Sequence, residues 1–128
     1  MQELTHYING AHVKGTSGRF ANIYNPATGE VQATVPMANA AEMDQAVAIA
    51  SKAQPAWASV NPQRRARVLM KFVDLLNRDM EKLAEALSRE HGKTIPDAKG
   101  DVIRGLEVVE YCIGAPQLLK GEYTDSAG

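Results

Sequence analysis

The chain is short of cysteine, of net charge and of long hydrophobic runs, and each shortage excludes a class of protein. Its 128 residues include one cysteine, so no internal disulfide can form. Fourteen basic and fifteen acidic side chains leave a formal net charge of −1, which provides no overall field to attract nucleic acid. No uncharged apolar run approaches the ~20 residues that span a bilayer. We therefore expect neither a nucleic-acid partner nor a membrane partner.

The first residues also lack the features of a secretory signal. Residues 1–7 contain neither a basic region nor an apolar stretch. Together with the single cysteine, this predicts a reducing, cytoplasmic setting. The length allows the chain to fold around one hydrophobic core at most.

Motifs for nucleotides and metals are absent as well. The sequence contains neither G-x-G-x-x-G nor G-x-x-x-x-G-K-[ST], the two common phosphate-binding patterns. Its histidines, its cysteine and its carboxylates nowhere adopt metal-ligand spacing. We therefore predict no nucleotide-binding loop of a known kind and no metal site within this chain.

Short strands and turns are predicted for residues about 5–36. Asn9-Gly10 lies between two β-prone runs and is the preferred pair for a two-residue hairpin turn. Residues 25–29 place Pro and Gly at turn positions. Residues 30–35 then alternate apolar and polar side chains until Pro36, as a half-buried strand does. This part of the chain should hold three or four strands.

From Asn39 onward the apolar spacing becomes that of α-helices. Asn39 and Glu42 have the spacing of a capping box, Asn61 precedes a proline at a second helix start, and Asp79 is a third candidate cap. The predicted helices cover about residues 40–53, 62–77, 80–91 and 96–115. The last of them should stop before Pro116. The predicted fold class is α+β, with short N-terminal strands followed by four helices.

The fourth predicted helix is apolar over more than half of its surface. One face carries Val102, Leu106, Val109 and Ile113, and Val108 and Cys112 extend it around the cylinder. A helix of this kind needs cover on two sides, which three other helices and a few strands do not supply. We expect further protein to pack here, and the chain alone to self-associate or to be marginally stable.

Arg104 lies at the rim of this apolar surface and has two interpretations. It can form a surface ion pair with Asp101 or Glu107, which lie three residues to either side. Alternatively, its planar guanidinium can receive a carboxylate from a ligand. The residues alone leave both readings open.

Two other features of this helix have simpler explanations. Cys112 lies on the apolar side, far from any helix N-terminus that would activate it, so we expect a buried structural thiol and not a nucleophile. Gly100 and Gly105 weaken the helix, which suggests a close approach by another backbone or by a ligand.

Several motifs occur in an order that resembles the N-terminal part of the aldehyde dehydrogenase superfamily. They are Tyr7-Ile8-Asn9-Gly10, residues 25–31, Pro55-Ala56-Trp57, residues 64–69 and Glu90-His91-Gly92-Lys93. Within that superfamily, residues 98–110 and 115–122 are most similar to its CoA-acylating methylmalonate-semialdehyde dehydrogenase branch. The resemblance extends over essentially the whole chain.

The resemblance implies that residues 1–128 are an N-terminal fragment of the NAD-binding domain of a longer enzyme, without its Rossmann-type core. It implies NAD and CoA as cofactors, the remainder of the chain as a partner, and assembly into a homo-oligomer, a dimer or tetramer. The implied reaction oxidises malonate or methylmalonate semialdehyde to acetyl-CoA or propanoyl-CoA. The family's catalytic cysteine and glutamate motifs have no match here, because neither Cys112 nor residues 90–93 fit them. The chain alone is expected to be inactive.

One position carries over from the resemblance as a site residue. In this branch an arginine of the fourth helix lines the substrate tunnel and holds the substrate carboxylate, and Arg104 occupies that place. Two alternatives remain for the chain as a whole. One is another aldehyde dehydrogenase branch that releases a free acid, and the other is a stand-alone helical interaction module.

Overall fold

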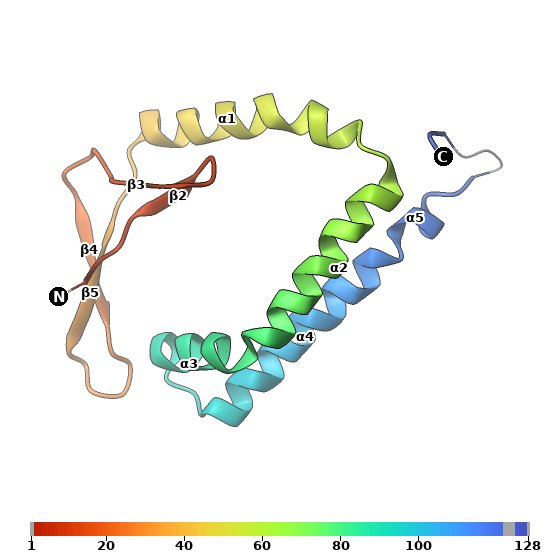
Figure 1. The fold of residues 1–128 in the computed structure, drawn as a ribbon. Helices are drawn as coiled ribbons and strands as arrows, with labels where there is room; N and C mark the ends of the chain where they lie inside the picture. Colours follow the sequence, from red (N-terminus) through yellow and green to blue (C-terminus); the bar gives the residue numbers. More distant parts are fainter. Residues whose placement is uncertain (1, 122–124, 128) are drawn as a thin grey trace. The chain divides into compact units, whose positions relative to one another are not determined.

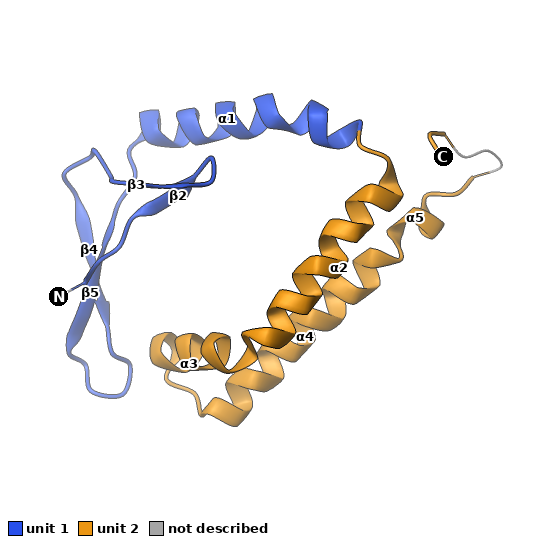
Figure 2. Cartoon of the chain, in the orientation of Figure 1, with its two compact units in different colours: residues 1–59 blue, residues 60–128 orange. Residues whose placement is uncertain are grey.

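The chain divides into two compact units, Met1–Ser59 and Val60–Gly128 (Figure 2). The computed structural model describes residues 2–121 and 125–127. Among these residues, the first unit holds the strands and one long helix, and the second holds the other helices (Figure 1). The sequence led us to expect one core at most, whereas buried residues occur in each unit, such as Ala33 in the first and Ala84 in the second.

The predicted hairpin is present in the first unit. Strand β2 (His6–Ile8) pairs antiparallel with strand β3 (Ala11–Val13). Asn9 and Gly10 connect them with φ values of 55° and 75°, which is the left-handed geometry that an Asn-Gly turn supplies. This prediction is confirmed.

A three-stranded sheet completes the β part of the first unit. Strand β5 (Val31–Pro36) lies in its centre, with β4 (Phe20–Tyr24) antiparallel on one side and β1 (Gln2–Glu3) parallel on the other. The sequence did not predict β1, because it is two polar residues long and has no apolar alternation. Pairing with β5 alone defines it.

Helix α1 (Ala40–Ala58) begins as predicted and ends later than predicted. Asn39 and Glu42 form the capping box, with both hydrogen bonds at 2.9 Å. We expected the helix to end at about residue 53, before Pro55. Instead Pro55 lies inside it, and the last turn is closed by Ser59, whose N–H donates to the Pro55 carbonyl at 3.1 Å. The helix thus continues past Pro55, although the proline removes one backbone N–H from it.

The second unit consists of packed helices. They are α2 (Pro62–Arg78), α3 (Met80–His91), α4 (Ile95–Ile113) and the short α5 (Ala115–Leu118). Helix α4 packs against both α2 and α3, and α2 also contacts α5 (Figure 1). The residues buried in this unit are Ala66, Ala84, Ala98 and Leu106. Three of these four are alanines, so the helix backbones can approach closely.

The fourth predicted helix ends within two residues of its predicted end, and a short helix that the sequence did not predict follows it. We expected a helix over about residues 96–115; α4 ends at Ile113 and α5 begins at Ala115 after Gly114. Pro116 lies in the first turn of α5, where a missing N–H costs nothing because that group has no helical partner. The proline therefore starts a new turn as well as ending the old helix.

Asp79 also differs from its prediction. It occupies the N-cap position of α3, but its side chain makes no capping hydrogen bond. Its carboxylate instead contacts the Arg78 guanidinium and, at 3.1 Å, the Lys82 ammonium. These hydrogen bonds, that to Arg78 foremost, lower the pKa of Asp79 to about 2.

The apolar surface of the chain is largely uncovered. Among the described residues no large side chain is fully buried, while Tyr7, Met43, Val47, Val108 and Tyr111 are all exposed. No helix in the described part of the chain is long and apolar enough to span a membrane. An exposed apolar surface of this kind is typical of a contact with a protein partner or with a further part of the same chain.

Candidate substrate-binding face

Helix α4 turns one side toward the other helices of its unit. Ala98 is 0% exposed and Leu106 is 8% exposed, while Val102, Val109 and Ile113 are half-buried. These positions recur at helical spacing, and α4 packs against α2 and α3. The apolar face predicted from the sequence is thus the packed face of this helix.

The other side of α4 carries Arg104 in an apolar setting. Arg104, Val108 and Tyr111 follow one another at intervals of four and three residues, so they share one side of the helix. Val108 is 62% and Tyr111 is 71% exposed, and Cys112 lies one turn beyond Val108. We call these four residues the Arg104 face. It offers a cationic group beside uncovered apolar surface.

One expectation for this helix is wrong in the described chain, and a second is tested in part. Cys112 is exposed and not buried, because the apolar side on which it lies has no cover here. A Cβ atom added to Gly100 or Gly105 would meet no atom within 4 Å, so no backbone outside α4 in the described residues approaches either glycine, and the approach of a ligand stays a prediction. Both observations identify open space along α4.

Arg104 has no partner of its own in this structure. Within residues 2–121 and 125–127 it makes no hydrogen bond or ion pair. Asp101 and Glu107 are each three residues away, a spacing at which acidic and basic side chains of a helix can pair. The predicted surface ion pair is therefore not formed. A guanidinium without a carboxylate can accept one from a ligand, in a two-point geometry that suits its planar fork.

Asp101 pairs with Lys93 and not with Arg104. The Lys93 ammonium lies 2.9 Å from Asp97 and also contacts Asp101, and its side chain is only 16% exposed. Hydrogen bonds to Asp101 and then to Asp97 raise the pKa of Lys93. The bond from Lys93 is the main cause that lowers the pKa of Asp101, and the charge of Arg104 contributes less.

Sequence reasoning missed Lys93. The spacing of four residues between Lys93 and Asp97 was a usable signal, but Lys93 precedes the helix, so helical spacing does not place its side chain. Its reach to Asp101 depends on the turn after α3. That turn is set by Gly92, with φ of 88°, and by a 2.7 Å bond from the Ser88 hydroxyl to the Lys93 carbonyl.

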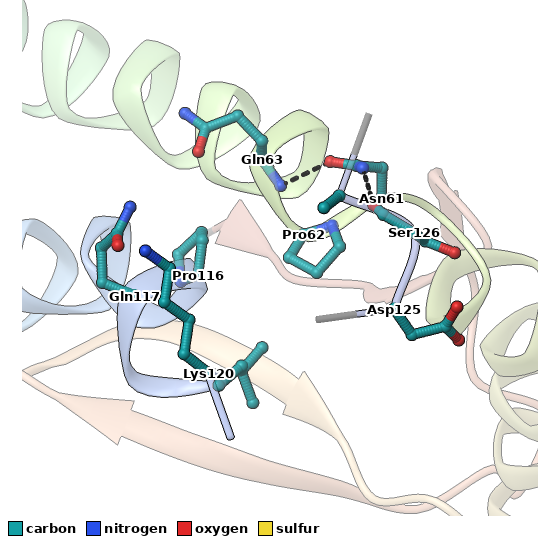
Figure 3. A pocket seen from close by; sticks show the side chains of 10 residues that line it. Asn61, Pro62, Gln63, Pro116, Gln117, Lys120, Asp125 and Ser126 are labelled. Carbon is teal, nitrogen blue, oxygen red and sulfur yellow. Dashed lines mark hydrogen bonds between the residues drawn. The ribbon is translucent and has the colours of Figure 1, made fainter. Parts of the chain in front are cut away.

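A separate hollow of about 250 Å³ lies where the start of α2 meets α5 and residues 125–127 (Figure 3). The side chain of Asn61, at the start of α2, already forms hydrogen bonds. The side-chain oxygen Oδ1 of Asn61 accepts from the Gln63 N–H at 2.9 Å, and its side-chain nitrogen donates to the Ser126 carbonyl. The hollow is also lined by Lys120 and Asp125, so it carries charges of both signs, whereas the Arg104 face offers a cation beside apolar surface.

Comparison with known proteins decides the family of the chain. The sequence model of the aldehyde dehydrogenase family matches residues 12–128. The chain belongs to the aldehyde dehydrogenase family. A malonate-semialdehyde dehydrogenase from Pseudomonas aeruginosa is 43% identical over all 128 residues, which cover 26% of that protein.

Two other members of the family are also similar. A Caenorhabditis elegans protein, described as an acylating mitochondrial methylmalonate-semialdehyde/malonate-semialdehyde dehydrogenase, is 46% identical over 91% of this chain and 22% of its own length. A structure from Sinorhizobium meliloti, described as a methylmalonate-semialdehyde dehydrogenase in complex with NAD, is 64% identical with a TM-score of 0.92. It matches 100% of this chain and 26% of its own. The chain thus spans about a quarter of the length of these aldehyde dehydrogenases.

Proposed function

We propose that this chain contributes one wall of the substrate site in a CoA-acylating, NAD-dependent malonate- or methylmalonate-semialdehyde dehydrogenase. In that reaction the aldehyde carbon is oxidised, two electrons pass to NAD as hydride, and the acyl group is transferred to CoA with loss of carbon dioxide. Nucleophile and cofactor sites would lie in the remainder of the family's length. The chain by itself would be inactive.

The names of the similar proteins support the substrate class. The relative from Pseudomonas aeruginosa is a malonate-semialdehyde dehydrogenase, and the Caenorhabditis elegans protein is described as acylating. The Sinorhizobium meliloti protein was solved with NAD. Malonate and methylmalonate semialdehydes each combine an aldehyde with a carboxylate, so a cation at a fixed distance from the reacting carbon would orient them.

The described glycines with positive φ do not form a glycine-rich phosphate turn. Gly10, Gly18 and Gly29 lie in turns between strands, and Gly92 follows the end of a helix. None of them opens a helix, which is where such a turn would bind a phosphate. The proposal therefore assigns the NAD and CoA contacts to the remainder of the family's length.

The observation that carries the proposal is the unpaired Arg104 on an apolar face. Its guanidinium is the group that would hold the substrate carboxylate, while Val108 and Tyr111 would form the apolar wall beside it. When the remaining protein covers this face, the local dielectric falls and the contact between guanidinium and carboxylate becomes stronger. Exposure of the same face would make the chain alone unable to bind substrate tightly.

The reaction is tested with the intact enzyme, malonate semialdehyde, NAD and CoA. We expect continued NADH formation to require CoA, with acetyl-CoA as the product, and at most one NADH per active site without CoA, because hydride transfer precedes acyl transfer. A rate that is independent of CoA, with a free acid as product, would assign the enzyme to another aldehyde dehydrogenase branch. Failure to oxidise any aldehyde would favour an interaction module.

The role of Arg104 is tested by Arg104→Leu in the same enzyme. A hydrogen bond to a charged group is worth about 1.5–3 kcal/mol, so the KM for malonate semialdehyde should rise roughly tenfold to a hundredfold. Propanal has no carboxylate, and its kinetics should change little. Arg67→Leu is the matched control, because Arg67 is an exposed arginine of α2 and should affect neither aldehyde.

Equal effects of Arg104→Leu on the two aldehydes would remove Arg104 from the substrate site. Oligomer formation is a further part of the proposal, supported by the uncovered apolar surface of both units. Location in the cytoplasm stays a prediction from the amino-acid composition.

A further inference from the structure

The charged groups around Arg104 form an arrangement that the family assignment does not explain. Asp97, Asp101 and Arg104 follow one another at intervals of four and three residues, so they occupy one stripe of α4. Lys93 lies just outside the helix and its ammonium contacts both carboxylates. The stripe thus holds two carboxylates and two cations, and only one of the cations is paired.

Lys93 is largely shielded from solvent in this arrangement. Its side chain is 16% exposed, and its backbone carbonyl accepts a 2.7 Å hydrogen bond from the Ser88 hydroxyl of α3. That bond holds the backbone of Lys93 beside the start of α4. Asp97 and Asp101 are more exposed, at 63% and 41% of their side chains.

Without Lys93 the nearest carboxylate would be free to take Arg104. Asp101 precedes Arg104 by three residues, which is a spacing at which acidic and basic side chains pair on a helix. The two are already close enough for the charge of Arg104 to lower the pKa of Asp101. A guanidinium that is held by Asp101 is not available for a ligand, and the second free carboxylate would repel an anionic substrate.

We propose that Lys93 is a positioning residue for substrate selectivity, which keeps Arg104 free for the substrate carboxylate by binding Asp97 and Asp101. This inference rests on the proposed function, since it assumes that Arg104 holds that carboxylate. Lys93 itself does not touch substrate. By binding the two carboxylates it leaves the positive charge of Arg104 free for the substrate.

The test is Lys93→Met in the intact enzyme, assayed with malonate semialdehyde and with propanal. In this variant Asp101 can form an exposed i, i+3 ion pair with Arg104, and this pair competes with the substrate carboxylate. The KM for malonate semialdehyde should therefore rise roughly twofold to fivefold. The kinetics with propanal should stay unchanged, because propanal does not need Arg104. Lys99→Met is the matched control, since Lys99 is also a lysine of this region but pairs with Glu81 of α3 at 2.5 Å.

A double variant separates this role from a merely structural one. In Lys93→Met/Asp101→Asn the competing carboxylate is gone, so the KM for malonate semialdehyde should return toward that of the parent enzyme. Loss of packing or stability would instead lower the activity with both aldehydes in proportion, and Asp101→Asn would not restore it. That outcome would overturn the inference, as would an unchanged ratio between the two aldehydes in Lys93→Met.

Comparison with Arg104→Leu distinguishes this inference from the proposed function. If Arg104→Leu discriminates between the two aldehydes and Lys93→Met does not, the role of Lys93 is wrong and the substrate site stands. If Arg104→Leu affects both aldehydes equally, the substrate site itself is wrong, whatever Lys93→Met does.

Discussion

Close packing of small residues in the second unit can be tested with one substitution in α3. Ala84 is 0% exposed, and α3 packs against α4, whose Ala98 is also 0% exposed. Leucine at position 84 adds three carbon atoms where no space exists, so the helices must separate or the side chain must adopt a strained conformation. Overpacking of this kind costs about 1–3 kcal/mol.

The expected change in melting temperature follows from the size of the unit. A change of 1 kcal/mol shifts the melting temperature of a domain of this size by about 4–8 °C. Ala84→Leu should therefore lower the unfolding midpoint of the 128-residue chain by several degrees or abolish its helical signal. Far-UV circular dichroism during thermal and urea unfolding, in dilute solution, measures both results.

Ala86→Leu is the matched control in the same helix. Ala86 is exposed, alanine and leucine have similar helix propensities, and surface substitutions usually change stability by less than about 0.5 kcal/mol. If Ala84→Leu and Ala86→Leu have the same effect, α3 does not pack through its alanine face, and the reasoning about this unit is refuted.

Three further predictions concern charge, glycine and association. The pKa of Asp79 is lowered from its ordinary 3.8 to about 2, so its stabilising contribution is present above about pH 4 and is lost as the pH falls toward 2. Asp79→Asn should therefore make the stability of the chain depend less on pH between about 4 and 2, and an unchanged pH dependence would contradict the assignment. Gly15→Ala should destabilise the chain, because its Cβ would lie 2.5 Å from the Pro36 Cβ. Gly100→Ala would meet no described atom and should stabilise α4 by up to about 1 kcal/mol, so the two substitutions should shift the unfolding midpoint in opposite directions. The 128-residue chain should self-associate through its uncovered apolar residues, which light scattering after size-exclusion chromatography would detect, and a monomer with a cooperative melt at high temperature would argue against this.

Local signals in the sequence predicted most of the elements. The Asn9-Gly10 turn and the capping box of Asn39 with Glu42 involve residues close in sequence, and both are confirmed. The end of α1 was predicted too early, because the proline rule does not register the hydrogen bonds that follow Pro55. Local rules thus locate the beginnings of helices better than their ends.

The site was predictable only in part, for a physical reason. Helical spacing put Arg104 at the rim of an apolar surface, but it could not show whether Asp101 was free to pair with it. That depends on Lys93, which reaches Asp101 across the turn between α3 and α4. The exposure of Cys112 was likewise hidden, because apolar character predicts a need for cover and not its presence.

The central claim is that the Arg104 guanidinium holds the carboxylate of the substrate. The most direct test is a crystal structure of the intact enzyme with 3-hydroxypropanoate, which keeps the carboxylate of malonate semialdehyde and replaces its aldehyde by an unreactive alcohol. The account predicts two N–O contacts of about 2.7–2.9 Å between Arg104 and that carboxylate, with Lys93 still on Asp101. A carboxylate bound elsewhere, with Arg104 paired to a protein carboxylate, would contradict it.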